Sequence, residues 1–343
     1  MIVVVSFAFY ALLIYAIVEI EKDAPKSTIL DYFDAIWWSV VTITTVGYGD
    51  VSPVTDNGRL IGFIFLLVSL SFYAILIGRI TNLITNILEN RKMGYYGMKF
   101  TGHCVIIGWG SFGKMVTDQL VAAGKKVAVV TKDKDNIDLI REAYAAKDVF
   151  TLYSDMSHID ILDKVNIDES SIVFVNLEDD TQKLVYILNI KKHYDNLKFI
   201  VTMDNADLKD TFLSAGVKYA VSKTALASKL LASYIFEPHV ASYNEEIISY
   251  AATEEEYDMK EFAVLQDCPY VGKHYDKVFY DLKKECNAIL VGIAKQTESG
   301  RKLLKNPEGE VTIDEGDYLL MIANQKAERK IVKLFGTKEG YAG

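Results

Sequence analysis

The sequence predicts an α-helical membrane unit fused to a doubly wound α/β domain, with a small α+β subdomain at the C-terminal end. Two apolar runs of nearly membrane-spanning length flank a glycine-containing hexapeptide within the first 90 residues. A second glycine-rich turn then opens a series of short apolar strands that alternate with helical stretches. Half of the 343 residues are hydrophobic although 24% are charged, which fits an apolar part joined to an ordinary soluble part.

Composition excludes several classes of protein. The net charge of −9 gives no support for nucleic-acid binding, so we expect no nucleic-acid partner. The three cysteines, Cys104, Cys268 and Cys286, are too few and too far apart for a disulfide framework or a zinc site. Reduced thiols are expected. The five histidines are scattered, and none pairs at metal-ligand spacing.

The first apolar run, Ile2 to Val18, is expected to be a transmembrane helix, because it is near the ~20 residues that span a bilayer. A cleaved signal peptide is the alternative, but the run lacks a basic n-region and a small-residue cleavage site. The mostly acidic loop from Glu19 to Asp34 would concentrate cations at an outer mouth.

A short helix is expected to begin at Asp31 or Asp34, either of which can cap it, and to run to about Thr44. The partial negative charge of its C-terminal end would favour a cation there. The helix leads into the hexapeptide Thr45, Val46, Gly47, Tyr48, Gly49 and Asp50.

This hexapeptide predicts a re-entrant ion filter. Gly47 and Gly49 permit the left-handed backbone that lets consecutive carbonyls face one axis, and Thr45 adds a hydroxyl oxygen. Rings of such oxygens replace the water of a K⁺ ion, and the sequence matches the known filter of potassium channels. Because one chain supplies a quarter of each ring, a homotetramer is expected. A glycine-rich turn is the alternative, but it would need neither the preceding helix nor the flanking apolar runs.

The second apolar run, Leu60 to Gly78, also has spanning length. Basic residues follow it: Arg79, Arg91, Lys92 and Lys99. By the positive-inside rule, the C-terminal part then lies in the cytoplasm of a multi-pass protein of the inner (plasma) membrane, embedded in the lipid bilayer. Gly78, near the inner end of the helix, is a candidate hinge or gate, although glycine in a membrane helix can serve packing alone.

Residues 1–90 resemble the pore of a prokaryotic two-helix potassium channel, which implies that K⁺ is the permeant ion. We expect Trp37 and Trp38 to pack around Tyr48. Channels of this kind often carry a glutamate four residues before the filter threonine, as a partner for the aspartate after the filter. Here that position is Val41, so the partner of Asp50 stays open.

Residues 91–100 read as a linker that carries force to the gate, and a dinucleotide-binding pattern follows it. The strand His103 to Ile107 leads into the G-x-G-x-x-G turn of Gly108, Trp109, Gly110, Ser111, Phe112 and Gly113, and then into a helix from Lys114 to Ala123. Such a turn lets a phosphate approach the helix N-terminus. Alternatively, its glycines serve only the geometry of the fold.

An acidic residue is expected just after the second strand, Val127 to Val130, to hold the ribose. Thr131 and Lys132 stand there, followed by Asp133, and Lys132 suits a phosphate better. Further strands occur at 149–152, 172–175, 199–202 and 219–221. Asp155 follows the third strand, at a carboxyl end where ligands bind, and is a further candidate for nucleotide binding. The carboxylates Glu178, Asp180 and Asp204 follow the fourth and fifth, where they are either a Ca²⁺ site or helix caps.

Residues 101–335 resemble the RCK (regulator of K⁺ conductance) domain, related to the KTN domain of potassium transporters. We divide it at residues 101–252 and 253–343. The resemblance implies a gating ring of eight domains, with NAD, ADP or AMP, or Ca²⁺, as ligand. Four extra copies could come from internal initiation at Met93 or Met98. Calcium-gated members carry Glu-x-Glu after the fifth strand, whereas Thr202, Met203 and Asp204 stand here.

The combined interpretation is a K⁺-selective channel gated by an intracellular ligand, and not an enzyme. A membrane-tethered NAD-dependent enzyme would leave the filter unexplained, and no catalytic constellation stands out. A regulatory subunit of a K⁺ transporter would lack a pore of its own. The sequence does not indicate which ligand gates the pore, nor whether that ligand activates or inhibits it.

Overall fold

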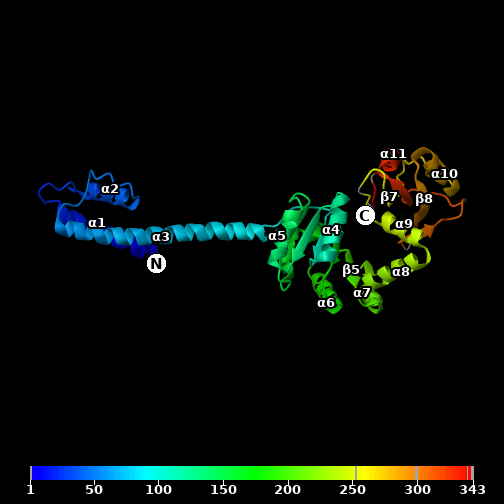
Figure 1. Ribbon diagram of the computed structural model, residues 1–343, viewed down its shortest axis with the longest axis horizontal. Helices are drawn as coiled ribbons and strands as arrows, with labels where there is room; N and C mark the ends of the chain where they lie inside the picture. The colour runs from blue at the N-terminus through cyan, green and yellow to red at the C-terminus, as the bar shows by residue number, and fades with distance from the viewer. Residues whose placement is uncertain (1, 252, 298–299, 338, 341–343) are drawn as a thin grey trace. The chain divides into compact units, whose positions relative to one another are not determined.

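The computed structural model describes residues 2–251, 253–297, 300–337 and 339–340. It divides into two compact units, residues 1–91 and residues 92–343, which are described separately (Figure 1).

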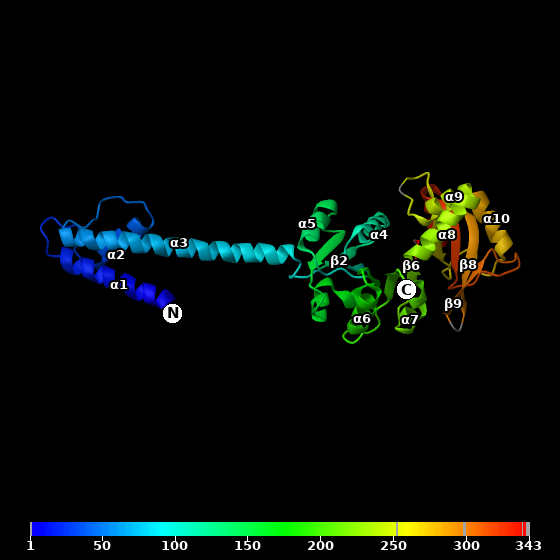
Figure 2. The same cartoon turned by 60° about the horizontal axis from the view of Figure 1, so that its bottom comes forward.

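The first unit is built from three helices, α1 (Ile2–Glu21), α2 (Tyr32–Ile43) and the long α3 (Asp56–Lys92), whose last residue already counts with the second unit. One apolar cluster holds them together, with buried residues from α1, α2, α3 and the connecting loop: Leu13, Ile14, Ile17, Val18, Ile29, Ala35, Trp38 and Phe65. Figure 2 shows α1 alongside the N-terminal half of α3.

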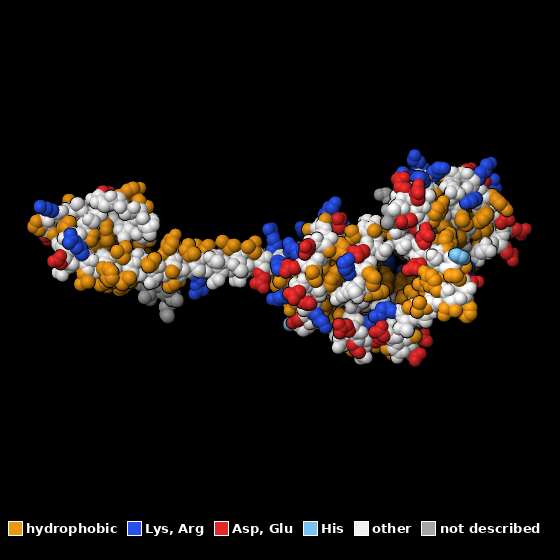
Figure 3. Space-filling model, viewed as in Figure 1, with side chains coloured by type: hydrophobic (Ala, Val, Ile, Leu, Met, Phe, Trp, Pro, Cys, Tyr) orange, Lys and Arg blue, Asp and Glu red, His pale blue; other side chains and the backbone are white. Residues whose placement is uncertain are grey.

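α3 is, within the described residues, the helix whose length and apolar composition suffice to cross a membrane. Hydrophobic side chains lie along it and remain exposed in the single chain (Figure 3), among them Leu60, Leu70, Leu83 and Leu88. An apolar helix surface of this extent requires cover by lipid or by other chains. The other predicted span, Ile2 to Val18, lies within the 20-residue helix α1, and its membrane crossing stays a prediction.

The second unit begins with a six-stranded parallel sheet of order β3-β2-β1-β4-β5-β6. Its strands are β1 (Cys104–Ile107), β2 (Val127–Thr131), β3 (Val149–Tyr153), β4 (Ile172–Val175), β5 (Phe199–Met203) and β6 (Tyr219–Ser222). The helices are α4 (Ser111–Ala122), α5 (Lys134–Ala143), α6 (Asp180–Ile190) and α7 (Lys209–Ser214). α4 and α5 contribute to the apolar cluster on one face and α6 to that on the other, which confirms the predicted doubly wound fold.

Two helices, α8 (Lys223–Phe236) and α9 (Pro238–Ile248), lead to a smaller subdomain. Its antiparallel sheet has the order β7-β10-β8-β9. The elements are β7 (Tyr257–Ala263), α10 (Tyr275–Cys286), β8 (Ile289–Thr297), β9 (Gly300–Lys305), β10 (Tyr318–Asn324) and α11 (Gln325–Phe335). An antiparallel sheet with two helices confirms the α+β class predicted for this subdomain.

Candidate functional site

The filter hexapeptide adopts a left-handed backbone at every second residue. The φ angles of Thr45, Gly47 and Gly49 are 60°, 58° and 75°, and those of Val46 and Tyr48 are not positive. Alternating left- and right-handed residues turn successive carbonyls toward one side, as expected for a row of ion ligands. This conformation is unfavourable for Thr45 by roughly 1–2 kcal/mol, because the residue is not a glycine. Both glycines therefore adopt the left-handed backbone that was expected of them, and their role in binding K⁺ stays a prediction.

The pore helix α2 fixes where this segment starts. Asp31 caps the helix by accepting hydrogen bonds from the amides of Phe33 (2.8 Å) and Asp34 (3.0 Å), so the first of the two proposed caps is confirmed. At the other end, the carbonyl of Val41 accepts from the amides of Val46 (3.1 Å) and Gly47 (3.3 Å). These bonds tie the filter to the negative end of the helix dipole.

Trp37 holds the outer end of the filter. Its indole ring stacks on Tyr48 at 6.2 Å between centroids and 6° between planes. Its Nε1 donates a hydrogen bond to Asp50 Oδ2 at 3.0 Å. The sequence predicted that Trp37 and Trp38 would both pack around Tyr48, whereas Trp38 packs on Phe65 at 5.1 Å between ring centroids. The partner of Asp50 had been left open, because Val41 offers only a buried apolar side chain. The structure supplies that partner from a different turn of the helix.

Glu21 was expected to lie in the acidic loop that starts at Glu19, but it is the last residue of α1. Its side chain is fully buried. The carboxylate accepts hydrogen bonds from the amides of Val54 and Thr55, both at 3.0 Å, and from the Thr55 hydroxyl at 2.6 Å. Gly58 leaves room for the carboxylate, because a Cβ there would lie 1.9 Å from Glu21 Oε1. The bonds join the end of α1 to the start of α3, which no local sequence pattern indicated.

Two glycines of α3, Gly62 and the candidate hinge Gly78, differ in their surroundings. A Cβ at Gly62 would lie 3.5 Å from Pro53 and 3.6 Å from Trp38, so this glycine sits at a close helix contact. A Cβ at Gly78 would meet no atom within 4 Å. Among the residues that the structure describes, no packing contact therefore accounts for glycine at position 78, and its role as a hinge stays a prediction.

The G-x-G-x-x-G turn lies between β1 and α4, as predicted, next to the switch point between β1 and β4. Gly108 has a φ of 95°, and a Cβ there would lie 2.4 Å from the Asn176 carbonyl oxygen. A Cβ at Gly113 would lie 3.2 Å from Asn176 Nδ2. Both glycines therefore serve close packing of the turn against the loop after β4.

Gly110 is different, because a Cβ there would point into open space. It is the N-cap of α4 and, having no side chain, provides no side-chain cap for the following amides of Ser111, Phe112 and Gly113. Uncapped amides at a helix N-terminus are suited to a phosphate group. The turn thus combines two glycines needed by the fold with one position that a ligand can approach.

The end of β2 carries no carboxylate. Thr131 is buried, and its Oγ1 accepts from the Asp133 amide (3.2 Å) and from Asn136 Nδ2 (3.3 Å). Asp133 caps α5 by accepting from the Asp135 amide at 3.0 Å. The neighbouring β3 ends at the same edge, where the Ser154 amide donates to the Thr131 carbonyl at 2.9 Å.

Asp155, next along the chain from Ser154, is held by Ser157. It accepts from the hydroxyl at 2.6 Å and from the amide at 3.0 Å, and these bonds lower the pKa of the Asp155 carboxyl. The sheet therefore brings together the ends of β2 and β3, as predicted, but each carboxylate at this edge already has an internal donor.

The proposed calcium ligands do not converge on one cation. Asp180 pairs with the fully buried Lys183 at 2.8 Å and accepts from the amides of Asp204 and Asn205, both at 3.0 Å. Asp204 pairs in turn with Lys223 at 3.0 Å. In the described part of the chain, no group of three or more acidic, histidine or cysteine side chains is placed to hold a metal ion. The two lysines thus already neutralise the carboxylates that a bound cation would otherwise neutralise.

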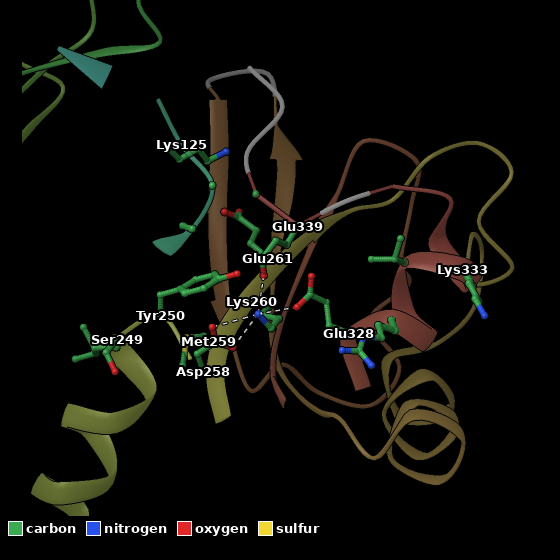
Figure 4. Close-up of a pocket in the computed structure, with 16 residues that line it drawn as sticks. Lys125, Ser249, Tyr250, Asp258, Met259, Lys260, Glu261, Glu328, Lys333 and Glu339 are labelled. Carbon is green, nitrogen blue, oxygen red and sulfur yellow. Dashed lines mark hydrogen bonds and ion pairs between the residues drawn. The ribbon is translucent and has the colours of Figure 1, made fainter. Parts of the chain in front are cut away.

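The small subdomain contains a charge cluster that the sequence did not reveal (Figure 4). Lys260, on β7, is almost fully buried and lies 2.8–3.1 Å from carboxylate oxygens of Asp258, Glu328 and Glu339. Burial opposes its charge, but the three carboxylates prevail and raise the pKa of Lys260. The cluster borders a cavity of about 960 Å³. Since its three acceptors come from β7, α11 and the tail after α11, it acts as a structural tie.

Comparison with known proteins matches both parts of the chain. Residues 1–86 match the ion channel family, and residues 104–223 match the TrkA-N domain family. "Potassium channel protein 1" of Methanocaldococcus jannaschii is 24% identical over 90% of this chain and 87% of its own length. The "Calcium-gated potassium channel TvoK" of Thermoplasma volcanium is 24% identical over 90% of this chain and 86% of its own length.

One solved structure supports the fold, and another is similar at a lower score. The human SLO3 gating ring has a TM-score of 0.51 and 11% identity, covering 68% of this chain and 46% of that one. The "GsuK channel bound to NAD" covers 98% of this chain with 16% identity and a TM-score of 0.40, and this chain spans 58% of its length.

The fold and the filter thus define a channel subunit with a regulatory α/β domain. The chain carries an ion channel domain followed by a TrkA-N (RCK) domain, and it is homologous to prokaryotic potassium channels. These relatives are named as channels and not as enzymes, so the homology argues against the membrane-tethered oxidoreductase.

Proposed function

We propose that this protein is a K⁺-selective channel whose pore is gated by an intracellular ligand bound to the RCK domain. The observation that carries the proposal is the filter backbone, left-handed at Thr45, Gly47 and Gly49 and braced by the Trp37–Asp50 hydrogen bond. A turn at the surface of a soluble protein would need no such alternation. The two relatives similar over most of the chain, which are named as potassium channels, support the choice of ion.

The assembly that we propose is a homotetramer around the pore, since one chain provides a quarter of each oxygen ring. A ring of eight RCK domains beneath it would require four further copies, for which internal initiation at Met93 or Met98 is the proposed source. Exposed apolar side chains on α8 and α9 support pairing of these domains, because they need cover: Leu226, Leu231, Ile235, Phe236, Val240 and Ile248.

Within the membrane we propose two spanning helices, α1 and α3, in the inner (plasma) membrane, with the RCK domain in the cytoplasm. Arg79, Arg91, Lys92 and Lys99 support this orientation through the positive-inside rule. We divide the chain into a pore domain (1–90), a linker (91–100), a Rossmann-like domain (101–252) and a C-terminal subdomain (253–343).

The ligand that we propose is a nucleotide such as NAD, ADP or AMP, with its phosphates at Gly110 and the N-terminus of α4. The open space at Gly110 and the absence of a side-chain cap support this position. Ca²⁺ is the second candidate, favoured by the name of one relative. The pairing of Asp180 and Asp204 with lysines makes Glu178, Asp180 and Asp204 a poor Ca²⁺ site in this state.

Gating would act through the segment from Met93 to Phe100. The Met93 carbonyl accepts from the Tyr153 amide (2.9 Å), and the Phe100 carbonyl accepts from Asn166 Nδ2 (2.9 Å). A Cβ at Gly94 would lie 2.2 Å from the Thr151 carbonyl oxygen, so this segment packs tightly on the domain. A ligand that changes the angle between paired domains would therefore pull on the C-terminal end of α3 at Lys92, and we propose that the helix bends in response at Gly78, further up the same helix.

The experiment that tests the proposal is ion flux from liposomes containing the purified protein. K⁺ and Na⁺ are compared, each with and without NAD, ADP and Ca²⁺. Selective K⁺ flux changed by one ligand is the expected result. Gly110→Val should abolish the nucleotide response and leave K⁺ selectivity intact, because only the ligand approach is blocked. Equal Na⁺ and K⁺ flux would contradict the proposed K⁺ selectivity, and no flux from folded tetramers would contradict the channel function itself.

A further inference from the structure

We propose that the nucleotide site selects ligands with a phosphate on the adenosine 2′ position, of the NADP type, over their 2′-hydroxyl counterparts, and that Lys132 contacts this phosphate. The inference rests on the proposed nucleotide site at the Gly108–Gly113 turn and names its ligand class. In folds of this kind, the end of the second strand reads the ribose edge. A carboxylate there accepts hydrogen bonds from the ribose hydroxyls, whereas a cationic side chain accommodates a 2′-phosphate.

The residue at the end of β2 cannot act as the ribose carboxylate. Thr131 is 1% exposed and directs its oxygen toward its own turn, where the Asp133 amide and Asn136 Nδ2 donate to it. The hydroxyl is therefore part of the β2–α5 connection. A ligand hydroxyl that reached this edge would find no free carboxylate at the strand end.

The two nearest carboxylates have structural roles. Asp133 caps α5, and Asp135 lies in the first turn of the same helix, where both match the positive end of its dipole. Asp155, at the end of β3, accepts both the hydroxyl and the amide of Ser157. Turning Asp133 or Asp155 toward a ribose would break bonds that hold the surrounding loops, so each is a poor substitute for the missing residue.

Lys132 is the charged side chain left for a ligand at this position. It is exposed, follows the buried Thr131 directly, and forms no ion pair with any residue that the structure describes. The adjacent Lys134 lies over the Tyr153 ring at 5.4 Å, so a second positive charge is close by. A 2′-phosphate brought to the end of β2 would meet an ammonium group where a 2′-hydroxyl would meet none of its usual acceptors.

The test uses pairs of ligands that differ only in the 2′-phosphate. NADP⁺ and NAD⁺ are titrated into the full-length protein in detergent by calorimetry, and adenosine 2′,5′-bisphosphate and AMP form a second pair. Binding of the phosphorylated member should be about tenfold tighter, the effect expected of one exposed charge-assisted contact. The preference should shrink as salt rises, since the contact is exposed.

Variants separate this contact from general charge effects. Lys132→Gln should remove the preference. Lys147→Gln, at an exposed lysine just before the N-terminal end of β3, should keep it, because that end of the strand lies away from the C-terminal end of β2. Lys132→Glu places a carboxylate at the same exposed position and should reverse the order, so that NAD⁺ binds more tightly.

Two results would overturn the inference, and they are distinguishable. Equal binding of both pairs, or tighter binding of NAD⁺ by the unmodified protein, rejects the 2′-phosphate and keeps the nucleotide site. Loss of NAD⁺ binding in Asp133→Asn would identify the acceptor in that case. No binding of any of the four ligands rejects the nucleotide site itself, and the 2′-phosphate contact with it.

Discussion

The indole Nε1 of Trp37 donates a hydrogen bond to Asp50 Oδ2 at 3.0 Å, across 13 residues of sequence. The same indole ring stacks on Tyr48, so one side chain of the pore helix contacts two residues of the filter. This arrangement explains how the filter keeps an anchor at its outer end although position 41 is valine. The aspartate is held by a neutral donor and not by a second carboxyl group.

Replacing Trp37 with phenylalanine tests this anchor, because the ring that stacks on Tyr48 remains while the donor is lost. We expect K⁺ flux to decline faster at low K⁺ concentration and the filter to lose about 1 kcal/mol of stabilisation, since the bond is partly exposed. Flux time courses from liposomes measure the effect. Trp38→Phe is the control, since that indole packs on Phe65 at 5.1 Å and leaves the Asp50 bond intact. If the flux of Trp37→Phe declined at the same rate as that of the unmodified protein, the hydrogen bond would not anchor the filter.

Glu21 provides a second test, at the junction of α1 and α3. Glu21→Ala would leave the amides of Val54 and Thr55 without an acceptor in a buried site, which should lower the free energy of unfolding by about 2–4 kcal/mol. Gly58→Ala should act in the same direction, because its Cβ would collide with the carboxylate. Thermal unfolding of the detergent-solubilised protein measures both. Glu19→Gln, which disturbs only an exposed pair with Lys22, should change stability by less than about 1 kcal/mol.

The structure could be predicted from the sequence where it is determined by neighbouring residues of the chain. The filter backbone follows from glycine at positions 47 and 49, and the parallel sheet follows from short apolar strands that alternate with helices. The burial of Glu21, Lys183 and Lys260 could not be predicted, because their partners lie elsewhere in the fold and charged residues in a sequence are usually solvated. The missing ribose carboxylate was visible at Thr131, but the commitment of Asp133 to a helix cap became clear only from the structure.

Replacing Asp180 tests whether the carboxylates after β4 have a structural role or form a calcium site. Asp180→Ala would leave the buried Lys183 ammonium and two amides without their acceptor, which should cost about 3–5 kcal/mol. Glu178→Gln, at an exposed neighbour, should have little effect. Unfolding with and without Ca²⁺ decides the question. Stabilisation of the unmodified protein by Ca²⁺ that disappears in both variants would restore the calcium site.

His103 should make the RCK domain sensitive to acid. It is buried with Nε2 against the Val165 carbonyl at 2.9 Å, and burial lowers the pKa of its imidazole despite this bond. Between the lowered folded pKa and the unfolded value of about 6.5, the unfolded chain binds a proton that the folded domain does not. The stability that neutral His103 contributes is therefore present above about pH 6.5 and is lost as the pH falls toward the folded pKa.

Thermal unfolding at pH 7.5 and pH 5.5 measures this loss. His103→Gln, which keeps a donor for the Val165 carbonyl, should show a smaller difference between the two pH values. His239→Gln, at an exposed position, should retain the full difference. An unchanged pH dependence in His103→Gln would assign the acid sensitivity to another group.

The apolar surface of α8 and α9 should carry the contact between paired RCK domains. Phe236 is 81% exposed and Ile235 is 78% exposed in the single chain, so a charge at either position should leave the fold of that chain intact. Phe236→Asp would instead place a carboxylate in the contact and oppose pairing. We expect K⁺ selectivity and the pore tetramer to survive while the ligand response of the flux is lost, because the pore is built by α2, α3 and the filter. Tyr280→Asp, at a 69% exposed residue of α10, is the matched control and should respond normally. A normal ligand response in Phe236→Asp would mean that the gating signal passes through another surface of the RCK domain.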